Sequence, residues 1–199
     1  MEAEQQSAKQ LKKHLAIFAS GTGTNAEKII QHFSLHPTII VSLIVCNKPG
    51  AGVINIAKQN NIPVLMIEKP TFIQNGYLID LQHHKIDFIV LAGFLWKIPE
   101  VLIEQYRNRI INIHPALLPK YGGKGMYGHK VHDAVLAGED TESGITIHYV
   151  DEHYDNGDVI LQVSCPVYKS DTSDTLSARI HSLEHTHFAK VVEDVVGKL

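Results

Sequence analysis

Several features are scarce in this 199-residue chain, and each absence excludes a class of protein. Cysteine occurs twice, at Cys46 and Cys165. Both lie in apolar runs, which argues against a disulfide-stapled secreted domain and predicts buried, reduced thiols. Apolar runs such as TIIVSLIVC are far shorter than a membrane span. The polar start MEAEQQSAKQLKKH lacks the apolar centre of a signal peptide. We therefore expect a cytoplasmic protein without a membrane partner.

Excess charge of one sign is also lacking. Lys and Arg number 18 and Asp and Glu 21, which gives a net charge of −3, and no basic block occurs. Nucleic acids bind clustered Lys and Arg, so no nucleic-acid partner is expected. Hydrophobic residues make up 44% of the chain, enough to bury a sizeable core.

Apolar runs alternate with amphipathic segments through the first part of the chain. Behind a polar extension at 1–13, the runs predict strands, and the segments between them predict helices, including one long helix over 71–84. Continuous apolar strands are typical of a parallel sheet covered on both faces. The strands are expected at 14–20, 38–46, 62–67, 86–94 and 109–114, and the other helices at 26–33, 51–60 and 99–106.

The pattern changes after residue 115. YGGKGMYG, residues 121–128, has four glycines and is expected to be a mobile loop. A helix is expected over 129–138, and two alternating segments, 144–150 and 158–167, should pair as an antiparallel hairpin. Residues 172–196 predict a capped closing helix. The fold class is thus α/β: a single domain at 14–199 with a Rossmann-like, doubly wound, mainly parallel sheet, a C-terminal antiparallel hairpin and a closing helix.

The segment SGTGTN, residues 20–25, follows the first expected strand and opens the first helix. Backbone amides at such a helix start form an anion site. The segment also fits the dinucleotide fingerprint, which expects an acidic residue roughly 20 positions later. No Asp or Glu lies between Glu27 and Glu68, so a single phosphate is favoured over a dinucleotide. A tight turn without a ligand is the alternative.

The strand RIINIH places Asn112 and His114 on one face, because side chains two apart on a strand point the same way. An amide and an imidazole at a strand's carboxyl end can hold a developing oxyanion. No serine elbow is present, and neither cysteine ends a strand beside a base. If acyl transfer occurs, the nucleophile therefore belongs to the substrate. A strand-capping histidine is the simpler alternative.

Two further clusters are open to more than one interpretation. HSLEHTH contains His181, Glu184 and His185 in the H-x-x-E-H pattern of zinc sites, but no third ligand is evident, so a metal is not expected. The connector DEHYDNGD, residues 151–158, carries four acids and suits a solvated turn. It follows a strand that should join the same sheet. Its Asp155 is therefore predicted to share a cleft with His114, in contact or through one water, because a carboxylate favours the imidazolium that donates to an oxyanion.

VLAGF (90–94), NIHPALLP (112–119), GITIHYVDEHYDNGDVILQ (144–162) and SGTGTN occur in an order and spacing that resemble the phosphoribosylglycinamide formyltransferases, within the wider family of 10-formyltetrahydrofolate enzymes. The resemblance runs from about residue 14 to 196. It implies formyl transfer from 10-formyltetrahydrofolate to the amine of 5-phosphoribosylglycinamide in purine biosynthesis. It also implies small-molecule substrates, no metal, and a monomer or weak homodimer.

The resemblance also implies roles for individual residues. The catalytic residues would be Asn112, His114 and Asp155. The ribonucleotide would contact Gly23, Thr24, Asn25 and Glu184, with the phosphate on the first three and the ribose on the last. The folate cosubstrate would contact Leu95, Trp96, Lys97 and Ile98 and, through the connector, Asp151, Glu152, His153 and Tyr154.

Some positions depart from the family pattern. Trp96 stands where many members have Arg, and a second folate-contacting Arg has no clear counterpart, with Gln74 or Asn75 nearest. Two other functions stay open: formylation of another amine, such as a nucleotide-linked amino sugar, and a non-catalytic nucleotide-binding module.

Overall fold

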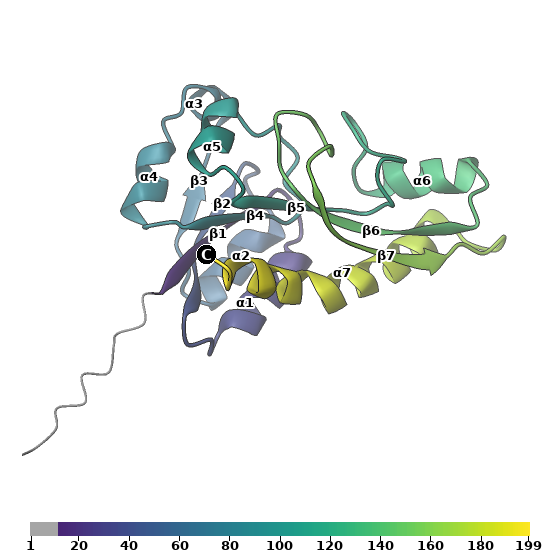
Figure 1. Ribbon diagram of the computed structural model, residues 1–199, viewed down its shortest axis with the longest axis horizontal. Coiled ribbons are helices and arrows are strands. Elements are labelled where there is room, and N and C mark those ends of the chain that lie inside the picture. Colours follow the sequence, from purple (N-terminus) through teal and green to yellow (C-terminus); the bar gives the residue numbers. More distant parts are fainter. Residues whose placement is uncertain (1–11) are drawn as a thin grey trace, which may run out of the picture.

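One seven-stranded sheet runs through the computed structural model, which describes residues 12–199 (Figure 1). The strand order is β3-β2-β1-β4-β5-β6-β7. Strands β1 to β5 pair in parallel, whereas β6 pairs antiparallel with both β5 and β7. The expected mainly parallel sheet with a C-terminal antiparallel hairpin is thus confirmed. The strands are β1 (Lys13–Ala19), β2 (Ile39–Cys46), β3 (Val64–Met66), β4 (Phe88–Leu91), β5 (Ile110–His114), β6 (Glu142–Tyr149) and β7 (Val159–Pro166).

Helices cover both faces of the sheet (Figure 1). Buried residues of α1, α2 and α7 form one core cluster with the sheet, and those of α3, α4 and α5 form another on the opposite face. Most of the expected extension, residues 1–11, lies outside the described residues. The helices are α1 (Thr24–Phe33), α2 (Gly52–Gln59), α3 (Lys69–Ile73), α4 (Leu78–His83), α5 (Glu100–Gln105), α6 (His129–Ala137) and α7 (Ser173–Val196).

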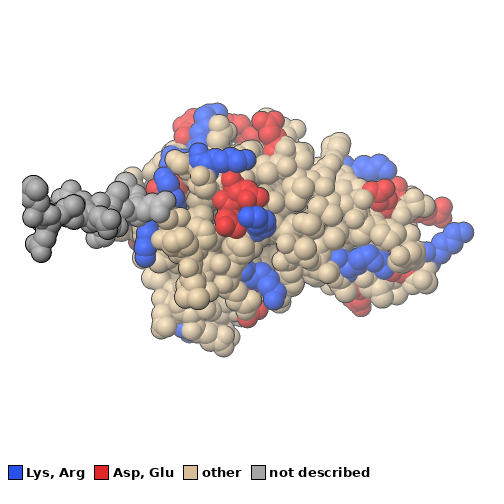
Figure 2. Space-filling view, turned by 60° about the horizontal axis from the view of Figure 1, so that its bottom comes forward, with Lys and Arg blue, Asp and Glu red and all other residues tan. Residues whose placement is uncertain are grey.

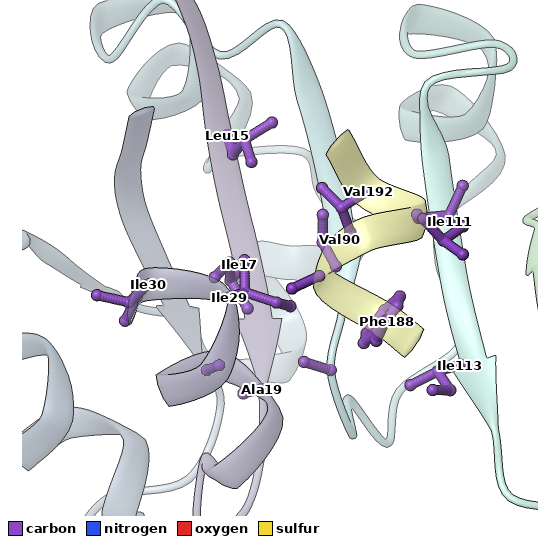
Figure 3. Packing of buried hydrophobic residues seen from close by; sticks show 14 of the residues in the cluster. Leu15, Ile17, Ala19, Ile29, Ile30, Val90, Ile111, Ile113, Phe188 and Val192 are labelled. Atoms are coloured by element: carbon purple, nitrogen blue, oxygen red, sulfur yellow. The ribbon is translucent and has the colours of Figure 1, made fainter. Parts of the chain in front are cut away.

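The closing helix α7 is held at its start and along its length. The Thr172 hydroxyl accepts a hydrogen bond from the Thr175 backbone N–H and the Thr175 hydroxyl accepts one from the Thr172 N–H, a capping box that satisfies helix-start amides. Farther along, Phe188 and Val192 lie between the helix and the sheet strands that carry Val90 and Ile111 (Figure 3). Truncating a buried aromatic such as Phe188 to Ala costs about 3–5 kcal/mol, so this packing fixes the helix on the sheet.

The prediction of one helix over residues 71–84 is wrong. The chain forms α3 and α4 instead, separated by a turn at Asn75 and Gly76. Asn75 has a φ of 64°, a left-handed conformation that ends a helix and that Asn tolerates better than most residues. The Gly76 amide donates back to the Thr71 carbonyl and closes the end of α3.

Acidic and basic side chains are interspersed on the face shown in Figure 2, with broad uncharged areas between them. No large area of one sign is visible on that face. Within residues 12–199, no helix combines the length and apolarity needed to cross a bilayer.

Candidate active site

A cleft of about 490 Å³ opens where β1, β4 and β5 end. This is the edge at which open α/β sheets hold their ligands, and the volume suits a small molecule. The loop before α1, the glycine-rich loop 121–128, the 151–158 connector and one side of α7 all contribute to its walls. Segments far apart in sequence therefore converge on one cavity.

His114 and Asp155 meet inside this cleft. The His114 Nδ1 lies 3.6 Å from Asp155 Oδ2, and His114 is only 3% exposed. The predicted proximity is thus confirmed, and the connector is more than a solvated turn. The other ring nitrogen, Nε2, lies 2.8 Å from the Tyr121 carbonyl oxygen, which can only accept, so Nε2 carries a proton. Nδ1 is therefore the nitrogen that faces the carboxylate.

Asn112 joins the pair through its amide. Its Nδ2 donates to His148 Nε2 at 3.1 Å and, over a long 3.4 Å, to Asp155 Oδ1. His148 Nδ1 donates to the Tyr149 carbonyl, which leaves Nε2 as an acceptor for the amide. Burial lowers the pKa of His148, and the Tyr149 carbonyl and Asp155 only partly oppose this. A neutral His148 thus orients the Asn112 amide.

The glycine-rich loop is tied to these side chains through its backbone. Besides the Tyr121 carbonyl, the Gly123 N–H donates to Asp155 Oδ2 at 2.8 Å. Gly123 has a φ of 96°, which suits glycine, and this turn brings the amide up to the carboxylate. Asp155 itself has a φ of 52°, a conformation that Asp adopts more readily than most residues. The mobility expected of this loop stays a prediction.

The segment at 20–25 forms the other end of the cleft. Gly23 precedes α1 with a φ of 85°, and no side chain caps the helix. A Cβ on Gly23 would lie 2.7 Å from the Val53 Cα, so only glycine permits this packing of α1 against α2. The amides that begin α1 consequently face the cleft without a side-chain partner, in the arrangement that binds anions.

Asn25 and Glu184 are hydrogen-bonded to one another. The Asn25 Nδ2 donates to Glu184 Oε2 at 2.8 Å, and His181 Nδ1 lies 3.1 Å from the same oxygen. The contact with Glu184 raises the pKa of His181, against a smaller lowering by burial. Glu184 is 5% exposed, and its Oε1 remains available to a ligand. Carboxylate, amide and imidazole therefore form one hydrogen-bonded group beside the start of α1.

The two segments expected to contact folate, 95–98 and 151–154, lie together beside Asp155. A small cavity of about 70 Å³ is lined by Trp96, Lys97 and Ile98 and by Asp151, His153 and Tyr154. Leu95 lines the main cleft and an adjoining cavity of about 660 Å³. The Glu152 carboxylate instead lies 4.0 Å from Arg107 and lines neither cavity.

Residues 13–192 match the sequence model of the formyl transferase family. The chain belongs to this family. It is 43% identical over 190 residues to the chloroplastic phosphoribosylglycinamide formyltransferase of Vigna unguiculata and 35% identical over 191 residues to the phosphoribosylglycinamide formyltransferase of Bacillus subtilis. The alignments cover 92% of this chain and 60% of the plant protein, and 93% of this chain and 95% of the bacterial one. The crystal structure of phosphoribosylglycinamide formyltransferase from Bacillus halodurans superposes with a TM-score of 0.85 at 35% identity, covering 94% of this chain and 96% of that one.

Sequence reasoning missed part of this formyl transferase site. The sequence pattern predicts only a strand around His148. In the structure, His148 stands directly opposite Asn112 in the β5–β6 register. The Tyr121 carbonyl and the Gly123 amide were also missed, because backbone groups carry no signal in sequence. Among residues 12–199, no three His, Cys, Asp or Glu side chains are grouped as metal ligands, and His181 is turned to Glu184.

Proposed function

We propose that this formyl transferase moves the formyl group of 10-formyltetrahydrofolate to the amine of 5-phosphoribosylglycinamide, a step of purine biosynthesis. The observation that carries the proposal is the convergence of Asn112, His114 and Asp155 in a cleft that begins at the anion-binding start of α1. Relatives named for the same activity support it, including the bacterial one that this chain covers almost completely. The chain spans only 60–64% of the length of the plant relatives, so the activity and the substrates of this protein are stated as proposals.

The chemistry is a direct attack. The substrate amine forms a bond to the formyl carbon, and the carbonyl oxygen becomes an oxyanion held by Asn112 and by protonated His114. Losing one such donor typically costs roughly 2.7–4 kcal/mol of transition-state stabilisation. The long 3.4 Å bond from Asn112 to Asp155 is the contact that a substrate oxygen can replace at little cost.

Proton movement completes the transfer. The attacking amine must lose a proton, and the folate nitrogen must gain one when its bond to the formyl carbon breaks. Asp155 is 12% exposed on its side chain and is the carboxylate nearest to His114, so we assign this relay to it, directly or through one water. His148 and the Gly123 amide hold Asn112 and Asp155 in place for these roles.

The two substrates would occupy the two ends of the site. The ribonucleotide phosphate would lie on the amides of Gly23, Thr24 and Asn25, and the ribose hydroxyls on Glu184. At the folate end, Leu95 to Ile98 and residues 151–154 would enclose the pteridine. Neither site needs a bound metal for this chemistry. The absence of a metal stays a prediction.

The departure at Trp96 has a structural context. Its ring packs on Phe72 and Phe94, with ring centroids 5.6 Å and 6.1 Å away. The adjoining 660 Å³ cavity is lined by this ring, by Asn75 and by three lysines, Lys69, Lys97 and Lys124. We propose that the lysines take over from the missing arginines at the carboxylate end of folate, whereas Trp96 contributes an apolar wall.

The deciding experiment is a formylation assay with purified protein, 10-formyltetrahydrofolate and a panel of amines. Turnover with 5-phosphoribosylglycinamide alone supports the proposal, whereas turnover only with an amino-sugar nucleotide would replace the substrate. Binding of phosphate compounds without any turnover would indicate a non-catalytic module. A cytoplasmic location and a monomeric or weakly dimeric state stay predictions.

A further inference from the structure

A histidine in the cleft, His132, has no role in the mechanism described above. His132 lies on α6, lines the cleft, and is 2% exposed. Its Nδ1 is buried and forms no hydrogen bond within the described part of the chain. His132 therefore lies in the wall of the cleft with Nδ1 closed off inside the protein.

The surroundings of His132 place it at the ribonucleotide end of the cleft. The rings of His129 and His132 have centroids 6.2 Å apart. Burial and, to a smaller extent, His129 and His181 lower the pKa of His132 to about 4, against opposing effects of Glu184 and Asp133. The ring is consequently neutral at physiological pH, with one N–H and one acceptor nitrogen.

The position of the proton follows from the burial of Nδ1. An orphaned buried N–H is rarer in proteins than an orphaned acceptor, so the proton is expected on Nε2. Because Nδ1 is closed off, the ring can meet a ligand only through its Nε2 side. His132 thus offers the cleft a neutral N–H donor near His181 and Glu184.

We propose that His132 is a further substrate-binding residue, whose Nε2–H donates to an oxygen of the ribose-phosphate part of the ribonucleotide. This inference rests on the proposed function and adds to the Asn25–Glu184 group a donor from a different helix. A neutral donor suits this place, because burial disfavours the charged form of the ring.

Two variants test the inference. His132→Phe keeps a flat ring but removes the donor, and we expect a roughly ten- to hundredfold weaker affinity for 5-phosphoribosylglycinamide by calorimetry, with folate affinity unchanged. His132→Gln carries an amide N–H near the position of Nε2 and should recover part of the loss. His83→Phe, on α4 away from every cavity described above, serves as the control and should bind as the wild type does.

Thermal unfolding of the ligand-free proteins separates binding from a structural role. His132→Phe should unfold at or above the wild-type midpoint, because it replaces an unpartnered polar ring by an apolar one. A lower midpoint with unchanged ribonucleotide affinity in both His132 variants would overturn the inference. If His132→Phe does not fold, His132→Leu takes its place as the variant without a donor, and unchanged ribonucleotide affinity in His132→Leu overturns the inference.

Ribose 5-phosphate and inorganic phosphate complete the experiment as probes. Equal losses for both in His132→Phe place the hydrogen bond on phosphate, and a loss for ribose 5-phosphate alone places it on the ribose. If the wild type binds both probes but not 5-phosphoribosylglycinamide, the proposed function fails while the test of His132 still stands.

Discussion

Replacing Asp155 by Asn tests the proposed proton relay with the smallest change of shape. The carboxylate accepts from the Gly123 amide at 2.8 Å and faces His114 Nδ1 at 3.6 Å. Asn can keep the first bond through its carbonyl oxygen and tolerates the φ of 52°. Because the same Oδ2 also faces His114, the oxygen of Asn takes that place too, and its NH₂ group replaces Oδ1 beside Asn112. The variant should therefore fold and bind both substrates, but it lacks the carboxylate that accepts the proton.

The size of the effect can be estimated from these contacts. General acid–base catalysis contributes typically about 10²- to 10⁴-fold, so kcat should fall by that factor, or about 2.7–5.4 kcal/mol at 1.36 kcal/mol per tenfold. One charge-assisted hydrogen bond becomes neutral, which costs roughly 1–2 kcal/mol of folding stability. Steady-state kinetics with both substrates varied, together with urea unfolding, measures both numbers.

Asp158→Asn provides the control, because this acid lies in the same connector but is exposed and lines none of the cavities described here. It should retain wild-type kcat. A fall in kcat of less than about threefold in Asp155→Asn, well below the range for acid–base catalysis, would refute the relay. A rise in both KM values at unchanged kcat would instead assign Asp155 to binding.

Three other predictions concern the rest of the site. Exhaustive chelation should leave the formylation rate unchanged, and a loss that zinc restores would contradict the metal-free chemistry. Gly21 lines the cleft, and nothing lies within 4 Å of a Cβ there. Gly21→Val should therefore fold but narrow the phosphate end, which raises the KM for the ribonucleotide without affecting that for folate. Gly23→Val should instead lower the unfolding temperature, because its side chain clashes with Val53. Glu184 raises the pKa of His181, so the stability that their contact adds is complete below a pH of about 6.5 and disappears as the pH rises through the raised value. Wild type and His181→Gln should thus differ most in unfolding free energy at pH 6 and least at pH 9, and a difference independent of pH would exclude the charge as its cause.

The parts of the fold and site that could be predicted are those with a short-range periodicity. Apolar strands alternating with amphipathic helices predicted the sheet, and the two-residue period of a strand placed Asn112 beside His114. The closeness of Asp155 followed because its connector leaves a strand that had to join the same sheet edge. These inferences need only the direction of each strand and the face of each side chain.

The parts that could not be predicted depend on register or on backbone groups. The pairing of His148 with Asn112 depends on the β5–β6 register, which neither strand specifies alone. The break between α3 and α4 required the left-handed turn at Asn75 to outweigh an otherwise helical pattern. The loop contacts of Tyr121 and Gly123 use a carbonyl and an amide that every residue possesses.

The hydrogen bond between Asn25 and Glu184 joins the first helix of the chain to the last. During synthesis on the ribosome, Asn25 emerges long before Glu184, so the nascent protein has the proposed phosphate loop early but lacks the carboxylate proposed to hold the ribose. That end of the site forms only when α7 docks on the sheet. A chain released before α7 is made would contain Asn112, His114 and Asp155 and still lack a complete ribonucleotide site. This end of the cleft is therefore assembled only after the sheet has formed and α7 has docked on it.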